Sequence, residues 1–314
     1  MKVAGFFTGV GGIELGFKQA GFEIVYSNEI DSKPVHTFKQ NFPHANIIID
    51  DISNVQSETV PDVDIIVAGF PCQAFSIAGY QKGFEDKRGE IFFQLARIIR
   101  DKMPPLIFIE NVKNLLHHDN GNTFRIISQT LESYGYSLKP LLLNACEYGN
   151  IPQNRERIYI IGFKNKKLAE QFTAPKQTPL TKKISDIIPF EKEVDEKYYY
   201  TKTKNKFYDE LKKIITNPNT VYQWRRVYVR ENKAGLCPTL TANMGTGGHN
   251  VPLVLTKHGI RKLIPHECFL FQGYPKNFKL PTDVPDSVLY KQAGNSVVVS
   301  VIKRLAQKLA TLFD

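Results

Sequence analysis

Residues 2–20, KVAGFFTGVGGIELGFKQA, decide the fold of this chain. Residues 2–7 are mostly apolar and predict a strand, and the glycine-rich turn 8–12 follows directly. Residues 13–20 place apolar side chains at helical spacing, and Gly21 is suited to the left-handed position after a helix. A glycine turn that joins a strand to a helix lets backbone approach a ligand closely. The opening segment therefore predicts a ligand-binding α/β unit.

Strands and helices alternate along the rest of the first half. Asp31 or Ser32 is suited to cap the second helix, with Pro34 in its first turn. Further helices are expected at 91–102 and 123–135. Short apolar runs predict strands at 22–27, 46–49, 64–68, 106–109, 138–143 and 157–163. This alternation predicts an α/β fold with a doubly wound, mostly parallel sheet.

The composition is typical of a globular protein. The 314 residues are 42% hydrophobic, with a mean hydropathy of −0.27. No apolar run approaches the ~20 residues needed to cross a bilayer, and Met1 leads directly into a predicted strand, so we expect neither a membrane span nor a signal peptide. The four cysteines are scattered, without a metal-ligand spacing. We therefore expect a cytoplasmic protein with no disulfide framework and no metal.

The basic charge is concentrated in one internal segment. Of the formal net charge of +10, residues 164–236 carry +8, with 17 Lys and Arg against 9 Asp and Glu. Within it, residues 221–230 (VYQWRRVYVR) alternate arginines with aromatic side chains, which favours contact with a polyanion. A solvated lysine-rich linker would explain part of the same charge. Weak periodicity from 164 to 219 indicates the start of a second, smaller domain.

Cys72 is a candidate nucleophile. It follows the apolar run 64–68 within GFPCQAFS, residues 69–76. A thiol at the carboxyl end of a parallel strand lies where open α/β sheets bind ligands. The alternative is a buried, inert cysteine, which is the more common case for a single thiol.

Other candidate groups lie at neighbouring strand ends. Glu110 follows the apolar run 105–109 and should share the edge that carries Cys72. Arg155 and Arg157 are two residues apart, so in an extended chain they point to the same face, favour an anion and help to ionise a thiol. A structural carboxylate and a surface ion pair are the alternatives.

A further set of acids indicates a nucleoside. Glu29 lies 20 residues after Gly9, at the end of the second predicted strand, where a carboxylate can bind both hydroxyls of a ribose. Asp51 and Ile52 follow the next strand. Together they predict a nucleoside-bearing cofactor, although a solvated loop acid and an ordinary Asp-Asp turn remain open.

In this order the motifs resemble those of DNA (cytosine-5)-methyltransferases, most closely the bacterial restriction–modification enzymes. The motifs are FxGxGG from Phe7, Asn28-Glu29, Asp51-Ile52, FPCQ at 70–73, ENV at 110–112, QxRxR at 153–157 and GNS at 294–296. The resemblance spans the chain from Phe7 to the terminal helix. It implies an S-adenosylmethionine-dependent methyltransferase fold with a smaller target-recognition domain, and DNA between the two. We assign residues 1–165 and 285–314 to the catalytic domain and 166–284 to the recognition domain.

The resemblance also implies a reaction. The enzyme would transfer a methyl group from S-adenosyl-L-methionine to C5 of a cytosine flipped out of a short site in double-stranded DNA. Cys72 would form a covalent intermediate, and the product would protect DNA from a partner restriction endonuclease. A monomer is expected.

Residue roles follow from the matching motifs. The catalytic residues would be Cys72, Glu110, Arg155 and Arg157. The cofactor would be held by Phe7, Gly9, Gly11, Gly12, Glu29, Ile30, Asp51, Ile52, Pro71, Asn295 and Ser296. DNA would be bound by Gln73, Ser76, Arg88, Arg225, Arg226, Arg230, Thr239 and Leu240. Thr239 and Leu240 match the Thr-Leu signature of target-recognition domains, and the polar loop 243–250 is suited to groove edges.

Four positions depart from the family pattern. Gly5 replaces an acid that usually begins its Asp-Leu-Phe motif, and Ile30 stands at an often aromatic position. Asn150 belongs to a Tyr-Gly-x-Pro motif with one extra residue, and Phe269-Leu270 replaces Ala-Arg. None of these removes a catalytic group.

Three alternatives stay open at this stage. An amino-methylating DNA enzyme usually has Asp- or Asn-Pro-Pro-aromatic, whereas here Pro71 precedes a cysteine. An RNA cytosine methyltransferase could share the chemistry. A catalytically silent DNA-binding protein would use the basic segment without needing Cys72.

Overall fold

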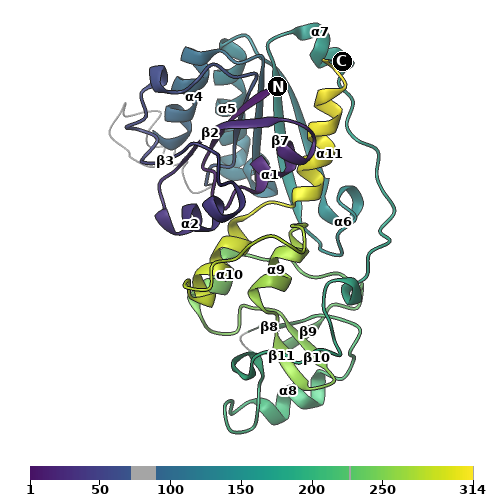
Figure 1. The fold of residues 1–314 in the computed structure, drawn as a ribbon. Helices are drawn as coiled ribbons and strands as arrows, with labels where there is room; N and C mark the ends of the chain where they lie inside the picture. The colour runs from purple at the N-terminus through teal and green to yellow at the C-terminus, as the bar shows by residue number, and fades with distance from the viewer. Residues whose placement is uncertain (72–89, 226–227, 314) are drawn as a thin grey trace. The chain divides into compact units, whose positions relative to one another are not determined.

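The computed structural model describes residues 1–71, 90–225 and 228–313; the side chains of Glu90 and Arg225 also lie outside the described part. The chain divides into two compact units, each with its own elements (Figure 1). Unit 1 comprises residues 1–143, 156–176 and 301–314, and unit 2 comprises 144–155 and 177–300. This division differs from the predicted domain boundaries in that residues 144–155 and 285–300 pack within unit 2 and residues 166–176 pack within unit 1.

A seven-stranded sheet forms the centre of unit 1. Its strands are β1 (Lys2–Phe6), β2 (Glu23–Glu29), β3 (Ile47–Ile49), β4 (Ile65–Ala68), β5 (Leu106–Val112), β6 (Ser137–Asn144) and β7 (Glu156–Phe163). The strand order is β3-β2-β1-β4-β5-β7-β6. Neighbours from β3 to β5 are parallel, whereas β5 and β7 are antiparallel. The predicted alternation and the mostly parallel sheet are confirmed.

The helices of unit 1 begin and end at local signals. They are α1 (Gly12–Gln19), α2 (Ser32–Asn41), α4 (Glu90–Lys102), α5 (Asn122–Ser133), α7 (Lys166–Gln171) and α11 (Val299–Ala310), the last of which starts in unit 2. Asp31 caps α2 by accepting a hydrogen bond from the Lys33 N–H at 2.9 Å, as expected. After α1 the chain turns at Gly21, which has a φ of 93°. Every described helix is too short or too polar to cross a lipid bilayer.

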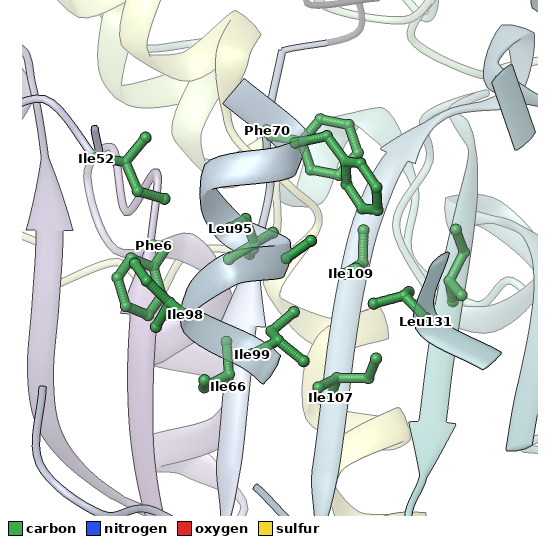
Figure 2. Packing of buried hydrophobic residues seen from close by; sticks show 14 of the residues in the cluster. Phe6, Ile52, Ile66, Phe70, Leu95, Ile98, Ile99, Ile107, Ile109 and Leu131 are labelled. Atoms are coloured by element: carbon green, nitrogen blue, oxygen red, sulfur yellow. The ribbon is translucent and has the colours of Figure 1, made fainter. Parts of the chain in front are cut away.

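Alternate residues of the strands separate the two faces of this sheet. Phe6, Ile66, Ile107 and Ile109 point to the face covered by α4 and α5, where they pack with Leu95, Ile98, Ile99 and Leu131 (Figure 2). The opposite face carries α1 and α11. There the rings of Phe17 and Phe108 meet edge to face at 5.1 Å, and a Cβ on Gly16 would collide with Ile302. Unit 1 is therefore a three-layer α/β structure.

Unit 2 contains a small antiparallel sheet. Its strands are β8 (Tyr222–Arg225), β9 (Tyr228–Glu231), β10 (Leu253–Thr256) and β11 (Gly259–Lys262), in the order β11-β10-β8-β9. The helices are α6 (Ala145–Tyr148), α8 (Tyr208–Ile214), α9 (Pro265–Phe271) and α10 (Asp286–Asn295). Leu211 of α8 and Ile215 pack on Tyr222, Leu253 and Ile260 of the sheet. The predicted smaller unit thus has a hydrophobic core of its own.

A buried ion pair joins β11 to α9. The guanidinium of Arg261 donates to both carboxylate oxygens of Glu267 at 2.7 and 2.8 Å, and both side chains are fully buried. Glu267 also accepts the Ile264 N–H at 2.9 Å and so caps α9. Removing either partner would leave an uncompensated charge away from water.

We expect Glu267→Gln to lower the free energy of unfolding of the protein by about 3–5 kcal/mol, because the Arg261 charge loses its counter-charge. Urea titration followed by circular dichroism measures the change. The matched control is Glu191→Gln, which breaks the exposed pair between Glu191 and Lys257 and should leave the midpoint unchanged. Equal midpoints for both variants would contradict the stabilising role of the buried pair.

Candidate functional site

The register of the parallel strands aligns their carboxyl ends. One row of paired residues crosses the sheet: Asn28, Phe6, Ala68 and Ile109. The next residue of each segment is therefore at the same edge: Glu29, Phe7, Gly69 and Glu110. This edge brings together the glycine turn, the expected ribose acid and the chain that leads to Cys72.

The turn after β1 is built from left-handed backbone. Phe7, Gly9 and Gly11 have φ values of 55°, 58° and 86°. A Cβ on Gly11 would collide with the stacked rings of Phe38 and Phe42, so only glycine fits there. A Cβ on Gly9 would meet no atom within 4 Å. The backbone at Gly9 is thus open to a ligand, while Gly11 is closed by helix packing.

Glu29 fixes this turn. Its Oε2 accepts the Gly9 N–H at 2.8 Å and its Oε1 accepts the Asp31 N–H at 3.0 Å. Each carboxylate oxygen has two lone pairs, so both keep capacity for a ligand hydroxyl. Ile30, the next residue, is 62% exposed. An apolar side chain is thus available beside the acid.

Residues 50–52 lie beyond the neighbouring strand β3. The Asn28 amide donates to the backbone carbonyl of Asp50 at 3.0 Å, which holds this segment against β2. Asp51 is exposed, and its Oδ1 accepts the Ser53 N–H at 2.9 Å. Ile52 is buried in the core of unit 1. Of the predicted pair, only Asp51 offers its side chain at the surface.

Glu110 lies beside the segment that precedes Cys72. Its Oε2 is 3.7 Å from the position of a Cβ on Gly69, and its Oε1 forms an ion pair with Arg157 Nε at 3.2 Å. Both side chains are almost buried, which strengthens the electrostatic interaction. Asn111, which we did not assign, donates its amide to the Phe70 carbonyl at 2.9 Å. Asn111 could have been predicted as a site residue from its position next to Glu110 in the ENV motif.

Arg155 and Arg157 take different partners. Arg157 belongs to β7 in unit 1, whereas Arg155 precedes the strand and packs in unit 2. Arg155 is buried and donates to the carbonyls of Leu240 at 2.7 Å, of Gly294 at 3.3 Å and of Ser296. Its guanidinium therefore joins two backbone segments of unit 2, one at Leu240 and one at 294–296.

Gln153 supports the same segments and was not predicted as a site residue. Its buried amide donates to the Phe271 carbonyl at 2.6 Å and accepts the Leu240 N–H at 3.2 Å. Thr239 donates its hydroxyl to the Asn154 carbonyl at 2.6 Å, and the Leu240 side chain is buried. These two bonds thus hold residues 239–240, the Thr-Leu segment, in place within unit 2.

The GNS motif ends α10. Asn295 is exposed, whereas Ser296 is buried and its hydroxyl lies 2.5 Å from that of Tyr274. The motif therefore offers the Asn295 side chain to solvent and fixes Ser296 inside unit 2.

Unit 2 also contains a cavity of about 960 Å³. Arg230 lines it and is paired in the β8–β9 ladder with Gln223, another lining residue. Trp224 and His249 stack at its wall with ring centroids 3.4 Å apart, and burial lowers the pKa of His249. The cavity combines a cation, amides and aromatic faces, a combination that suits nucleic-acid bases.

Several predicted residues lie outside the described part of the chain: Cys72, Gln73, Ser76, Arg88, Arg226 and the side chain of Arg225. Among the described cysteines, Cys237 and Cys268 are buried, and burial raises the pKa of both thiols well above its usual range. Neither is suited to act as a thiolate. The described residues contain no cluster of three or more metal-ligating side chains.

Solved structures with the same fold include the Dnmt2 methyltransferase of S. pombe, with a TM-score of 0.76 at 20% identity over 99% of each chain. The DNMT2 mutant of Spodoptera frugiperda has a TM-score of 0.74 at 21% identity, over 100% of this chain and 99% of that one. At these identities the likeness concerns the fold alone.

Curated relatives are much closer in sequence. The chain is 57% identical to the type II methyltransferase M.Bsp6I of Bacillus sp. (strain RFL6) over 311 residues, which are 98% of each protein. It is 40% identical to the type II methyltransferase M.HhaI of Haemophilus parahaemolyticus over 97% of this chain and 93% of that protein. The family profile of the C-5 cytosine-specific DNA methylases matches residues 1–311. The chain therefore belongs to the C-5 cytosine-specific DNA methylase family and is a DNA (cytosine-5)-methyltransferase.

Proposed function

We propose that this enzyme methylates C5 of a flipped-out cytosine in a specific double-stranded DNA site through a covalent bond to Cys72. The observation that carries the proposal is the Glu110–Arg157 pair beside Gly69, three residues before Cys72. This pair places a carboxyl group and a cation at the edge of the sheet, beside the chain segment that leads to Cys72. Cys237 and Cys268 are too deeply buried to compete.

In the proposed reaction the Cys72 thiolate adds to C6 of the cytosine, and the ring electrons move toward N3 and C5. The Glu110 carboxyl shares a proton with N3, so that the negative charge developing there is neutralised, and it accepts a hydrogen bond from the exocyclic amine. Carbon C5 then takes the methyl group as the bond between that methyl and the sulfonium sulfur breaks, which leaves a neutral thioether. C5 loses its proton to solvent, and the thiolate leaves from C6. This divides one difficult substitution into two easier steps. Arg157 orients Glu110 and holds the base, whose extrusion costs a few kcal/mol.

S-adenosylmethionine supplies a methyl group activated on a sulfonium sulfur. The described residues are suited to bind this cofactor. The backbone is open at Gly9, and the Glu29 carboxylate keeps lone pairs for the ribose hydroxyls. The α1 N-terminus also lacks a side-chain cap, so its N–H groups remain available to a carboxylate. The proposed binding residues are Phe7, Gly9, Gly12, Glu29, Ile30, Asp51, Pro71 and Asn295. Gly11, Ile52 and Ser296 are held within the packing, so we propose that they shape the site through their backbone.

For DNA we propose two kinds of contact. Arg230 and the polar wall of the unit 2 cavity read base edges, while Gln73, Ser76, Arg88, Arg225 and Arg226 contact the backbone or the strand around the target. The Thr-Leu segment acts through its attachment to Asn154 and Gln153. Arg155 acts as a positioning residue for the Thr-Leu segment and for the GNS motif.

The relatives are type II methyltransferases from bacteria. By analogy we propose that the chain acts as a monomer in the cytoplasm and protects a site that a partner restriction endonuclease would cut. The test is to express the enzyme in a methylation-free host and to sequence its plasmid after bisulfite treatment. Protected cytosines confined to one short motif are expected. Scattered protection, or methylated RNA with unmodified DNA, would contradict the proposal.

We expect Cys72→Ala to abolish methyl transfer while specific DNA binding persists, because the adduct cannot form but the recognition surfaces are intact. The measurement is a tritiated methyl-transfer assay together with a gel-shift assay. Cys146→Ala is the matched control, since Cys146 is a partly exposed cysteine outside the candidate site, and the variant should keep its activity.

A second readout tests the adduct itself. DNA with 5-fluorocytosine at the target should become covalently attached to the wild type and to Cys146→Ala, and not to Cys72→Ala. Methyl transfer by Cys72→Ala, or trapping by that variant, would rule out Cys72 as the nucleophile.

We expect DNA affinity to fall steeply with salt, because the basic segment 164–236 displaces counterions from the phosphates. Because Arg230 is proposed to read base edges, we expect Arg230→Ala to relax site preference at a cost of about 1–3 kcal/mol, while the slope of log K against log salt stays unchanged. Lys308→Ala, an exposed lysine of α11 outside the segment, is the control. An affinity independent of salt would contradict the role of the segment.

A further inference from the structure

Glu14 is an acid buried inside the apolar layer between α1 and the sheet, with a side chain that is 1% exposed. Its carboxyl lies in the space that a side chain at position 5 would need: a Cβ on Gly5 would stand 3.0 Å from Cδ and 3.2 Å from Cγ of Glu14. The absence of a side chain at Gly5 therefore provides the space that the Glu14 carboxyl occupies. The glycine that replaces the usual family acid makes room for an acid from the helix.

This carboxyl lies against strand residues and near Thr8 of the glycine turn. Gly5 is paired with Ser27 of β2 and Val67 of β4, so both lie beside it in the sheet. Within the described ranges, Glu14 Oε2 and the buried Ser27 hydroxyl have no hydrogen-bond partner. The carboxyl is thus incompletely satisfied.

Burial is the main cause that raises the pKa of Glu14 to about 7; hydrogen bonds to its own backbone and to the Thr8 hydroxyl act to lower the pKa, and the negative charge of Glu29 makes a smaller upward contribution. Glu29 is the same residue that fixes the Gly9 turn, so the two acids act on each other across that turn. The titratable or charged groups on the elements around α1 are Lys2, Lys18, Glu23, Tyr26, Glu29, Lys33, His36, Lys39, Asp64, Glu110, Lys303 and Arg304. Among the described residues, Glu29 is the charged group that perturbs Glu14.

We propose that Glu14 is a positioning residue that makes the cofactor site favour the cationic methyl donor over the demethylated product, by losing its proton when the donor binds. The proposal rests on the proposed use of S-adenosylmethionine. The donor carries a sulfonium charge, whereas the sulfur of S-adenosylhomocysteine is neutral. A cation held at the turn stabilises two neighbouring carboxylates that otherwise repel each other, and the Glu14 proton passes to solvent.

The direction in which donor affinity changes with pH follows from the linkage between donor binding and the ionisation of Glu14. Because a bound cation favours the ionised carboxyl, donor affinity should rise with pH up to about 7 and then level off, whereas product affinity should change little. Over that range we expect the ratio of product Kd to donor Kd to rise about three- to tenfold, the factor that results if donor binding lowers the pKa of Glu14 by about 0.5 to 1.

The experiment is isothermal titration calorimetry of the full chain, without DNA, with S-adenosylmethionine and with S-adenosylhomocysteine from about pH 5.5 to about pH 8.5, a range that brackets the titration of Glu14. At a pH just below 7, buffers of different ionisation enthalpy measure the protons released. We expect wild type to release a fraction of a proton when it binds the donor and almost none when it binds the product.

In Glu14→Gln we expect this proton release to be lost and the ratio of product Kd to donor Kd to become independent of pH, while donor binding persists. The exposed acid Glu23 provides the control Glu23→Gln, which should behave as wild type.

The outcomes separate the two proposals. Ionisation of the ligands is common to all variants, so it does not distinguish Glu14→Gln from wild type. A wild-type Kd ratio that is constant with pH, or proton release retained in Glu14→Gln, would overturn the role of Glu14 and leave the cofactor assignment standing. Failure of wild type to bind either compound would overturn the cofactor assignment. If Glu14→Gln does not fold, the buffer dependence of the wild type decides alone.

Discussion

The site depends on the register of three parallel strands. Because Phe6 of β1 is paired with Ala68 of β4, and Ala68 with Ile109 of β5, the residues that follow them emerge together at one edge. A slip of one residue in either ladder would turn Glu110 toward the other face of the sheet. The branched and aromatic side chains that lock this register belong to the core under α4 and α5, so packing on one face sets the chemistry at the edge.

The antiparallel partner of β5 contributes the cation. In a wholly parallel sheet, β7 would present its amino end on the opposite side, away from Glu110. Because β7 runs antiparallel, it begins at the functional edge, and Arg157 at its second position reaches Glu110. One reversed strand therefore converts a carboxyl at a strand end into half of an ion pair.

Much of the fold could be predicted from local sequence. Periodicity located the strands of unit 1 and its helices up to α5 but not α7, and the cap at Asp31 and the turn at Gly21 follow from single residues. The edge position of Glu29 and Glu110 followed from strand ends alone. The partners of Gln153 and Arg155 did not, because they join segments more than 80 residues apart in the chain. Nor could Glu14 be found, since an acid at a helical position looks like a solvated residue until the empty space at Gly5 is known.

The closed packing at Gly11 constrains how such a sequence can change over evolutionary time. Any larger residue there needs a different backbone conformation and also requires Phe38 and Phe42 to give way. No single nucleotide change can satisfy both demands, so intermediates on such a path would be destabilised. The first glycine turn and the second helix are therefore expected to be inherited, and exchanged by recombination, as one block.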